Sequence, residues 1–371
     1  MTQTTAPPVR VGEPPEPSGL RTRWRARDRY VGIRLPWTTV RFRPVVPLAF
    51  IALALVAVAG LVAHLVVGEY HLSVGAAIDA LRGDGDAGNL FVVRQLRLPR
   101  PLVGLAAGAA FGLSGALLQR VTGNDLASPD LLGVIAGANL GITVLTFGFP
   151  DLPVTMRLPV ALVCGLAAGV LVLLAAGGGG RAPLRVLLIG AGVTVVAQAI
   201  VAAVAANGEL VHAFRIVLWI VGGLYGRSWT ELNMAVNSLF VLAPAAFLLS
   251  RRLDHMEMGD DLAVAVGVPV RSTRGAAFVV ACALAAVGVA TTGPIAFVGL
   301  AAPHLARRLV GDATAGLLAV SAVAGAAVVV VADLIARTAL APREIPTGVL
   351  VPLVGVPVLL TLLHRQGRDP A

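Results

Sequence analysis

Long blocks of apolar residues with almost no charge are the feature that most constrains this chain. Of its 371 residues, 57% are hydrophobic and 13% are charged, whereas soluble domains are about a quarter charged. A bilayer core requires about 20 apolar residues per helix, and only helices or closed barrels satisfy the backbone there. Barrel strands alternate apolar and polar residues, and these blocks do not, so the sequence predicts an all-α polytopic membrane protein. The blocks are residues 45–67, 102–118, 131–150, 158–180, 186–207, 232–250, 275–303, 313–332 and 345–363.

The number of spans depends on the block at residues 275–303, which is too long for one helix. Gly293 and Pro294 form a natural break, because proline removes a helical donor and glycine frees the turn. Splitting there predicts about ten transmembrane helices, with the eighth over residues 295–310. The alternative is nine spans and a buried half-helix.

Charge placement predicts the orientation. All 29 basic residues are arginine. Ten spans with both termini inside put roughly two-thirds of them on the inner side, as the positive-inside rule favours. The net charge of +9 is therefore read as a topogenic signal, and nucleic-acid binding is the less economical explanation.

We expect two segments, a cytoplasmic Arg- and Pro-rich tail over residues 1–44 and a transmembrane domain over residues 45–366. No apolar stretch precedes residue 45, so the tail is no cleavable signal peptide, and its first part should be disordered. The alternation at residues 31–37 favours a short strand or an interfacial segment. Cys164 and Cys282 lie within apolar blocks and are interpreted as packing residues, with no metal site or disulfide framework.

The chain lacks the residues that would power transport. A P-loop needs a lysine beside its glycines, and the glycine run at residues 177–180 is followed by Arg181. An ion-driven carrier is expected to hold carboxylates deep in its spans, and the blocks are almost free of them. Asp333 lies near a helix end, and Arg337 four residues on is its simplest partner. Any active transport must therefore be driven by another protein.

The longest inner loop, residues 251–274, is the expected place of that connection. Asp260 and Asp261 favour a helix N-terminus, small and apolar residues follow, and Gly267 favours its end. An exposed apolar helix is poorly explained by solvation alone. Docking to a partner is favoured over a helix lying on lipid headgroups.

Glycines recur at helical spacing in two predicted spans. Gly104, Gly108 and Gly112 form one series, and Gly133, Gly137 and Gly141 form a second. Small residues allow helix backbones to approach closely in lipid. Tight packing is the favoured interpretation, although a cargo path lined by small residues would use the same glycines.

A series of motifs then resembles one family, the FecCD-type permeases of ABC importers for iron-siderophores, haem and vitamin B12. In chain order they are RLPR at 97–100, SGALLQ at 114–119, NDLASPDLLG at 124–133, GDDLAVAVGV at 259–268, FVGLAAPHLARRLVG at 297–311, ADLIAR at 332–337 and EIPTGVLVPLVGVPVLLTLL at 344–363. The resemblance covers nearly everything after residue 45. It implies ten helices per subunit and a two-subunit permease in the bacterial inner membrane. It also implies two cytoplasmic ATPase subunits that use ATP and Mg, and an external substrate-binding protein. No cofactor bound by this chain is implied.

The resemblance assigns the inner loop to coupling with the ATPase. Asp261, Leu262, Ala263, Val266 and Gly267 match the family's short coupling helix, which sits in a cleft of that subunit.

On the outer side, Arg97, Arg100 and Arg337 match the basic residues that receive acidic side chains of the binding protein. Arginine suits this role because its planar fork holds carboxylates bidentately. The alternative for Arg97 and Arg100 is headgroup anchoring.

The resemblance also places a gate at the inner junction of spans four and five, represented by Pro183, Leu184 and Arg185, with Gly137 and Asn139 assigned to the pathway. The segment at 181–185 lacks hydroxyl residues seen in some relatives, which puts gating detail in doubt.

Two single residues complete the prediction. Asp125 stands where the family commonly has proline, which we expect to loosen that turn without changing function. His304 is tempting as a metal ligand, but no second ligand lies at suitable spacing, so no metal site is predicted.

The leading hypothesis is a permease subunit that passes ferric siderophore and has no active site of its own. The same-fold alternative is a vitamin B12 or haem permease. The alternatives from other classes are an ion-gradient-driven secondary transporter and a non-transporting scaffold or receptor. Pairing with a related, non-identical permease is favoured over a homodimer.

Overall fold

The computed structural model describes residues 31–35, 38–42, 45–68, 70, 72–149, 151–175, 183–206, 219–341 and 343–366. It divides into two compact units, Met1–Val45 and Val46–Ala371. In the first unit, β1 (Val31–Leu35) pairs antiparallel with β2 (Thr38–Phe42), with Val31 opposite Phe42. Of the two interpretations of this segment, the strand is thus observed. The predicted disorder of the first part of the tail lies outside the described residues.

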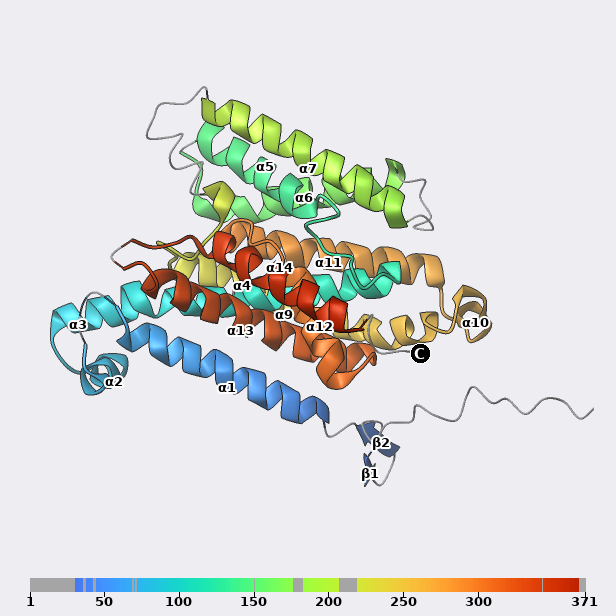
Figure 1. Ribbon diagram of the computed structural model, residues 1–371, viewed down its shortest axis with the longest axis horizontal. Helices are drawn as coiled ribbons and strands as arrows, with labels where there is room; N and C mark the ends of the chain where they lie inside the picture. The colour runs from blue at the N-terminus through green and yellow to red at the C-terminus, as the bar shows by residue number, and fades with distance from the viewer. Residues whose placement is uncertain are drawn as a thin grey trace, which may run out of the picture. The chain divides into compact units, whose positions relative to one another are not determined.

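The second unit is helical throughout its described elements (Figure 1). The order is α1 (Val45–Val66), α2 (Val74–Arg82), α3 (Ala87–Phe91), the π-helical segment η2 (Val92–Arg97), α4 (Pro99–Thr122), α5 (Val134–Gly148), the 3-10 turn η3 (Val154–Met156), α6 (Arg157–Ala175), α7 (Pro183–Ala206), α9 (Trp229–Met256), α10 (Asp260–Ala265), α11 (Val270–Thr292), α12 (Val298–Val310), α13 (Thr314–Thr338) and α14 (Thr347–Gln366). This confirms the predicted all-α membrane fold.

Seven helices among the described residues are long and apolar enough to cross a bilayer. Two further apolar helices are shorter: α5, and α14 over residues 347–357. The predicted break at Gly293 and Pro294 is present, because α11 ends at Thr292 and α12 begins at Val298. Since α12 has only 13 residues, the count of ten spans stays a prediction.

Helix α4 forms the centre of this unit and packs against α9, α11, α12 and α13. Figure 1 shows α5, α6 and α7 as a layer on one side of this central group and α1 on the other. Glycines make the central contacts possible. A Cβ added at Gly108 would lie 2.4 Å from the carbonyl oxygen of Gly325, and one at Gly112 would lie 2.2 Å from that of Ser321. The packing interpretation of these glycines is therefore supported.

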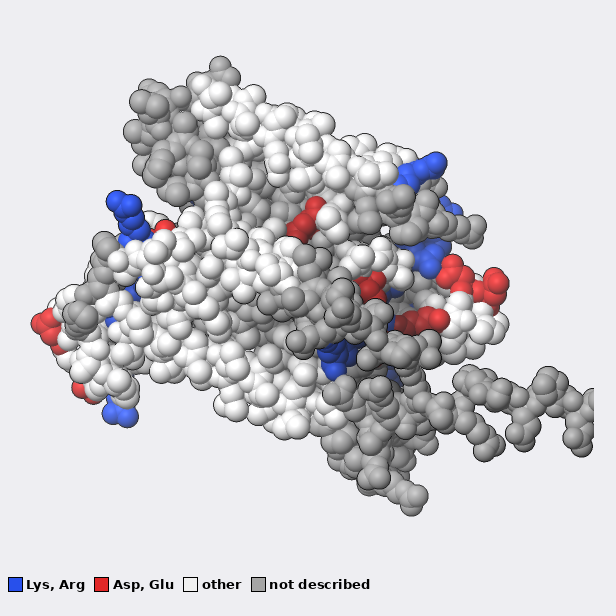
Figure 2. Space-filling model, viewed as in Figure 1, with Lys and Arg blue, Asp and Glu red and all other residues white. Residues whose placement is uncertain are grey.

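On the face shown in Figure 2, charged side chains lie mostly toward two opposite ends of the helices, and the belt between them is largely uncharged. Large apolar side chains are exposed along this belt, among them Leu55 on α1, Leu174 on α6 and Phe240 on α9. Exposed apolar surface on this scale is explained by contact with lipid or with another membrane subunit.

Candidate functional site

The predicted docking arginine Arg100 lies in a buried ion-pair network. Its guanidinium donates to Asp333, with Nε–Oδ2 at 2.7 Å and a second contact at 3.0 Å. It also donates to both carboxylate oxygens of Glu344, at 3.0 and 3.1 Å. Asp333 is fully buried and accepts a further hydrogen bond of 2.6 Å from the Thr347 hydroxyl. This network joins α4, α13 and the start of α14.

Sequence reasoning missed this network. It placed Asp333 near a helix end with Arg337 as its simplest partner, whereas its oxygens accept from α4 and α14. His64 of α1 is also fully buried, with Nε2 3.8 Å from Asp333 and 3.2 Å from the Val330 carbonyl. No local pattern signals these contacts, because the partners are more than 200 residues apart in the chain, except Thr347 and Asp333, which are 14 apart.

The other two predicted docking arginines bind the last turn of α1 and the chain that follows it. Arg97 donates to the carbonyl oxygens of Leu65, at 2.7 Å, and of Tyr70. Arg337 donates to that of Val67, at 2.9 Å. The structure thus brings the three arginines together and gives each a partner within the chain.

These arginines line one cavity of about 930 Å³ at the end of the bundle that holds α2 and α3. Four arginines and one carboxylate border it, so its charge favours anions. Its charged residues are Arg97, Arg100, Arg227, Arg337 and Glu344.

A second cavity of about 530 Å³ adjoins the same network. In it the guanidinium carbons of Arg157 and Arg227 each lie 4.7 Å from the ring centre of Trp219. Glu231 lies 3.9 Å from Arg157. The stack holds two cations on one indole, an arrangement stabilised by the ring's quadrupole.

The predicted coupling loop forms a short helix with an apolar exposed surface. Leu262 and Val266 are 58% and 59% exposed, whereas Ala263 is fully buried and anchors the helix. Asp261 is exposed as well. Gly267 has a φ of +84° and open space around its Cα. An apolar surface held out by so small a helix favours contact with another protein.

The predicted gate and pathway residues fall into different environments. Helix α7 begins at Pro183, the side chains of Pro183 and Leu184 lie outside the description, and Arg185 is exposed. Gly137 packs against α6, since an added Cβ would lie 2.4 Å from the Ala168 Cβ. Gly137 is therefore a packing residue and lies outside the lining of any described cavity.

Asn139, two residues further on, lines a cavity of about 310 Å³ bordered by α5, α7, the α11–α12 break and the start of α14. It is 6% exposed. The assignment of Gly137 and Asn139 to the pathway stays a prediction.

Asp125 forms an ion pair with Arg307 at 2.9 Å, and Asn124 Oδ1 accepts from the Leu126 amide at 2.9 Å. The turn is therefore held by side chains where the family's common proline is missing.

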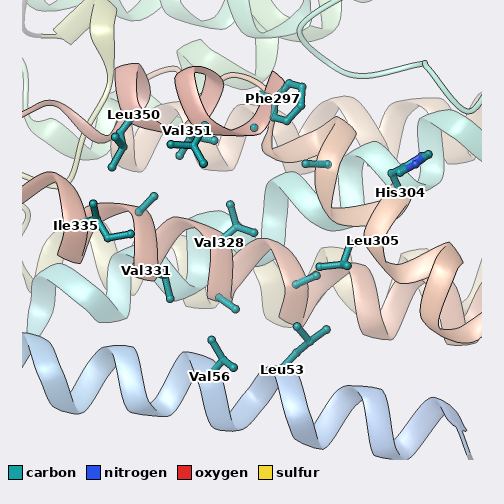
Figure 3. A pocket seen from close by; sticks show the side chains of 16 residues that line it. Leu53, Val56, Phe297, His304, Leu305, Val328, Val331, Ile335, Leu350 and Val351 are labelled. Atoms are coloured by element: carbon teal, nitrogen blue, oxygen red, sulfur yellow. The ribbon is translucent and has the colours of Figure 1, made fainter. Parts of the chain in front are cut away.

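Among the described residues, no group of three His, Cys, Asp or Glu residues could hold a metal ion. His304 borders an apolar groove of about 380 Å³ between α1, α12, α13 and α14 (Figure 3). The other lining side chains are hydrocarbon, among them Leu53, Val328 and Leu350. The groove suits lipid chains and offers nothing to a polar chelate.

Comparison with known proteins agrees with these features. A model of the FecCD transport family matches residues 54–365. The achromobactin transport system permease protein CbrC of Dickeya dadantii is 36% identical over 342 residues, covering 90% of this chain and 97% of that protein. The Fe(3+) dicitrate transport system permease protein FecD of Escherichia coli is 37% identical over 295 residues, covering 77% and 90%. A solved metal-chelate-type ABC transporter in an inward-facing conformation superposes with a TM-score of 0.74 at 29% identity, covering 86% of this chain and 99% of that one.

The helical bundle, its apolar belt and these matches define a multi-pass membrane permease of ABC importers, as opposed to their ATPase subunit. The chain belongs to the FecCD transport family. The family predicted from the motifs is confirmed.

Proposed function

We propose that this permease carries an iron chelate across the cytoplasmic membrane and that both termini of the chain lie inside. Ferric siderophore is the leading candidate for the chelate. Its relatives include permeases named for achromobactin, Fe(3+) dicitrate and ferric enterobactin. The observation that supports the proposal is the arrangement of two features at opposite ends of one bundle: the arginine-lined cavity by α2 and α3, and the exposed apolar helix α10.

The outer cavity is proposed to receive the acidic side chains of a substrate-binding protein. Arg97 and Arg337 supply the positive field. Arg100 contributes less, because Asp333 and Glu344 already neutralise it. A cavity that favours anions also favours an anionic ferric chelate released there.

At the opposite end, α10 is proposed to dock in a cleft of the ATPase. Leu262 and Val266 would supply the buried contact, and the ion pair between Asp260 and Arg274 at 2.9 Å holds the helix against α11. ATP and Mg are used by that partner. The functional unit is proposed as two permease subunits, related or identical, with two ATPases and one binding protein.

The test is uptake of radioactive iron by the complete importer in vesicles. Ferric citrate, a ferric hydroxamate and a ferric catecholate are supplied with the binding protein outside and ATP inside. Uptake should persist when a protonophore collapses the membrane potential and stop when the ATPase lysine is replaced. Uptake that follows the ion gradient and ignores ATP identifies a secondary transporter and overturns the proposal.

A further inference from the structure

Two non-helical segments meet inside the bundle. Helices α5 and α12 have 15 and 13 residues, or about 22 and 20 Å at 1.5 Å per residue, less than the roughly 30 Å of a hydrocarbon core. The segments that precede them, residues 123–133 and 293–297, therefore reach into the bundle. Non-helical backbone at such depth occurs where protein buries it or where it lines a cavity.

Asp130 joins the two segments. Its Oδ2 accepts a hydrogen bond of 2.8 Å from the backbone amide of Phe297. Phe297 has a φ of +74° and is the only described non-glycine residue in the left-handed region. One carboxylate oxygen thus caps the N-terminus of α12, where negative charge is favoured.

The other carboxylate oxygen has no partner. Asp130 Oδ1 and Asn139 Oδ1 are both buried and accept no hydrogen bond from any described residue. Both side chains line the 310 Å³ cavity. Leaving a buried acceptor unpaired costs about 1–3 kcal/mol, so two of them in one cavity indicate an occupant that donates hydrogen bonds.

The lining of this cavity has one formal charge, the carboxylate of Asp130. Its remaining described residues are uncharged, and Asn139, Thr194 and Gln198 are those with polar side chains. The cavity therefore favours cations and neutral donors and disfavours anions, in contrast to the arginine-lined outer cavity.

We propose that this cavity is a cargo-contact site in which Asp130 and Asn139 bind a cationic hydrogen-bond donor of the iron chelate, an ammonium group. The inference rests on the proposed function, since it assigns a group of the cargo to a place on its path. The outer cavity collects the chelate through its anionic part, and the inner cavity selects for a donor on another part of the same molecule. A ligand that offers only anionic groups is disfavoured there.

Charged thiol reagents test the cavity without knowledge of the natural cargo. Asn139→Cys is introduced into the assembled importer in lipid nanodiscs. It is labelled with a trimethylammonium methanethiosulfonate and with the sulfonate analogue of similar size. The ratio of the cationic to the anionic labelling rate is divided by the same ratio for Leu126→Cys, an exposed position in the α4–α5 connection, after subtraction of the wild-type background.

We expect the normalised ratio of cationic to anionic labelling to be on the order of ten, because one unit of negative charge lies several ångströms from the labelled position. Asp130→Asn, which keeps an acceptor for the Phe297 amide, should bring the ratio close to the control. Ala136→Cys, on the same lining, should behave like Asn139→Cys and serves if that variant does not fold. Equal rates, a preference for the anionic reagent, or no labelling at either position overturns the proposal.

A protection experiment tests the cargo role. A linear ferric trihydroxamate with a terminal ammonium should slow cationic labelling of Cys at position 139 severalfold more than its N-acetylated form. Equal protection, or none, overturns the inference while iron uptake by the wild-type importer can still uphold the proposed function. Conversely, absence of ATP-driven iron uptake refutes the proposed function whatever the labelling ratio.

Discussion

Removing the charge of Asp333 should destabilise the bundle more than removing that of any exposed carboxylate among the described residues. Asp333→Asn keeps the shape of the side chain and leaves the guanidinium of Arg100, itself 8% exposed, with one fewer charged partner. Breaking a buried pair by neutralising one partner costs about 3–5 kcal/mol. Because Glu344 still contacts Arg100 at 3.0 Å, we expect the lower end, about 3 kcal/mol.

Glu344→Gln is the matched control. The Glu344 side chain is 31% exposed, so water can replace part of the lost contact, and we expect a cost of about 1 kcal/mol. The assay is unfolding of the purified permease by SDS in mixed micelles, followed by fluorescence of its four tryptophans.

A double variant then separates a buried ion pair from general packing. Arg100→Met with Asp333→Leu removes both charges, and replacing a buried pair by apolar residues is often neutral or stabilising. It should therefore be more stable than Asp333→Asn alone. The reasoning is refuted if Asp333→Asn lowers the unfolding free energy no more than Glu344→Gln does. It is also refuted if the double variant loses as much stability as Arg100→Met and Asp333→Leu lose together when each is made alone.

Three further predictions concern docking and packing. Val266→Asp should reduce copurification of the ATPase severalfold with insertion unchanged, whereas Leu126→Asp, exposed in the α4–α5 connection, should not; equal effects would remove the docking role of α10. Gly108→Ala should cost more than 2 kcal/mol, because its Cβ would lie 2.4 Å from a backbone carbonyl, while Gly192→Ala, with nothing within 4 Å, should be neutral within about 0.5 kcal/mol in the same SDS assay. Arg337→Gln should weaken binding-protein association most at low ionic strength, and an affinity loss independent of salt would contradict an electrostatic role.

The helical membrane fold could be predicted from the sequence because the bilayer leaves few options for long apolar blocks. The break at Gly293 was also predictable, since it depends on local chemistry. The bounds of α5 were not. The prediction began that span at residue 131, but the helix begins at Val134, after a connection held inside the bundle by Asp130 and Phe297.

The functional residues also divide into those predictable from local sequence and those that depend on contacts between distant helices. The short helix in the loop at residues 251–274 could be predicted because acidic residues, a short apolar run and a glycine lie together in sequence, while its coupling role stays a prediction. The roles of Asp333, His64 and Asp130 could not, because each depends on partners brought close only by packing of distant helices. The sequence prediction paired Asp333 with Arg337 and assigned no contact to Asp130, so it missed that these two carboxylates organise the arginine network and the 310 Å³ cavity.

The most direct test of the account is iron-chelate uptake into vesicles that contain the permease with and without its ATPase. The account predicts accumulation against a gradient only when the ATPase, internal ATP and the binding protein are all present. Accumulation by the permease alone, driven by a proton or sodium gradient, would contradict it.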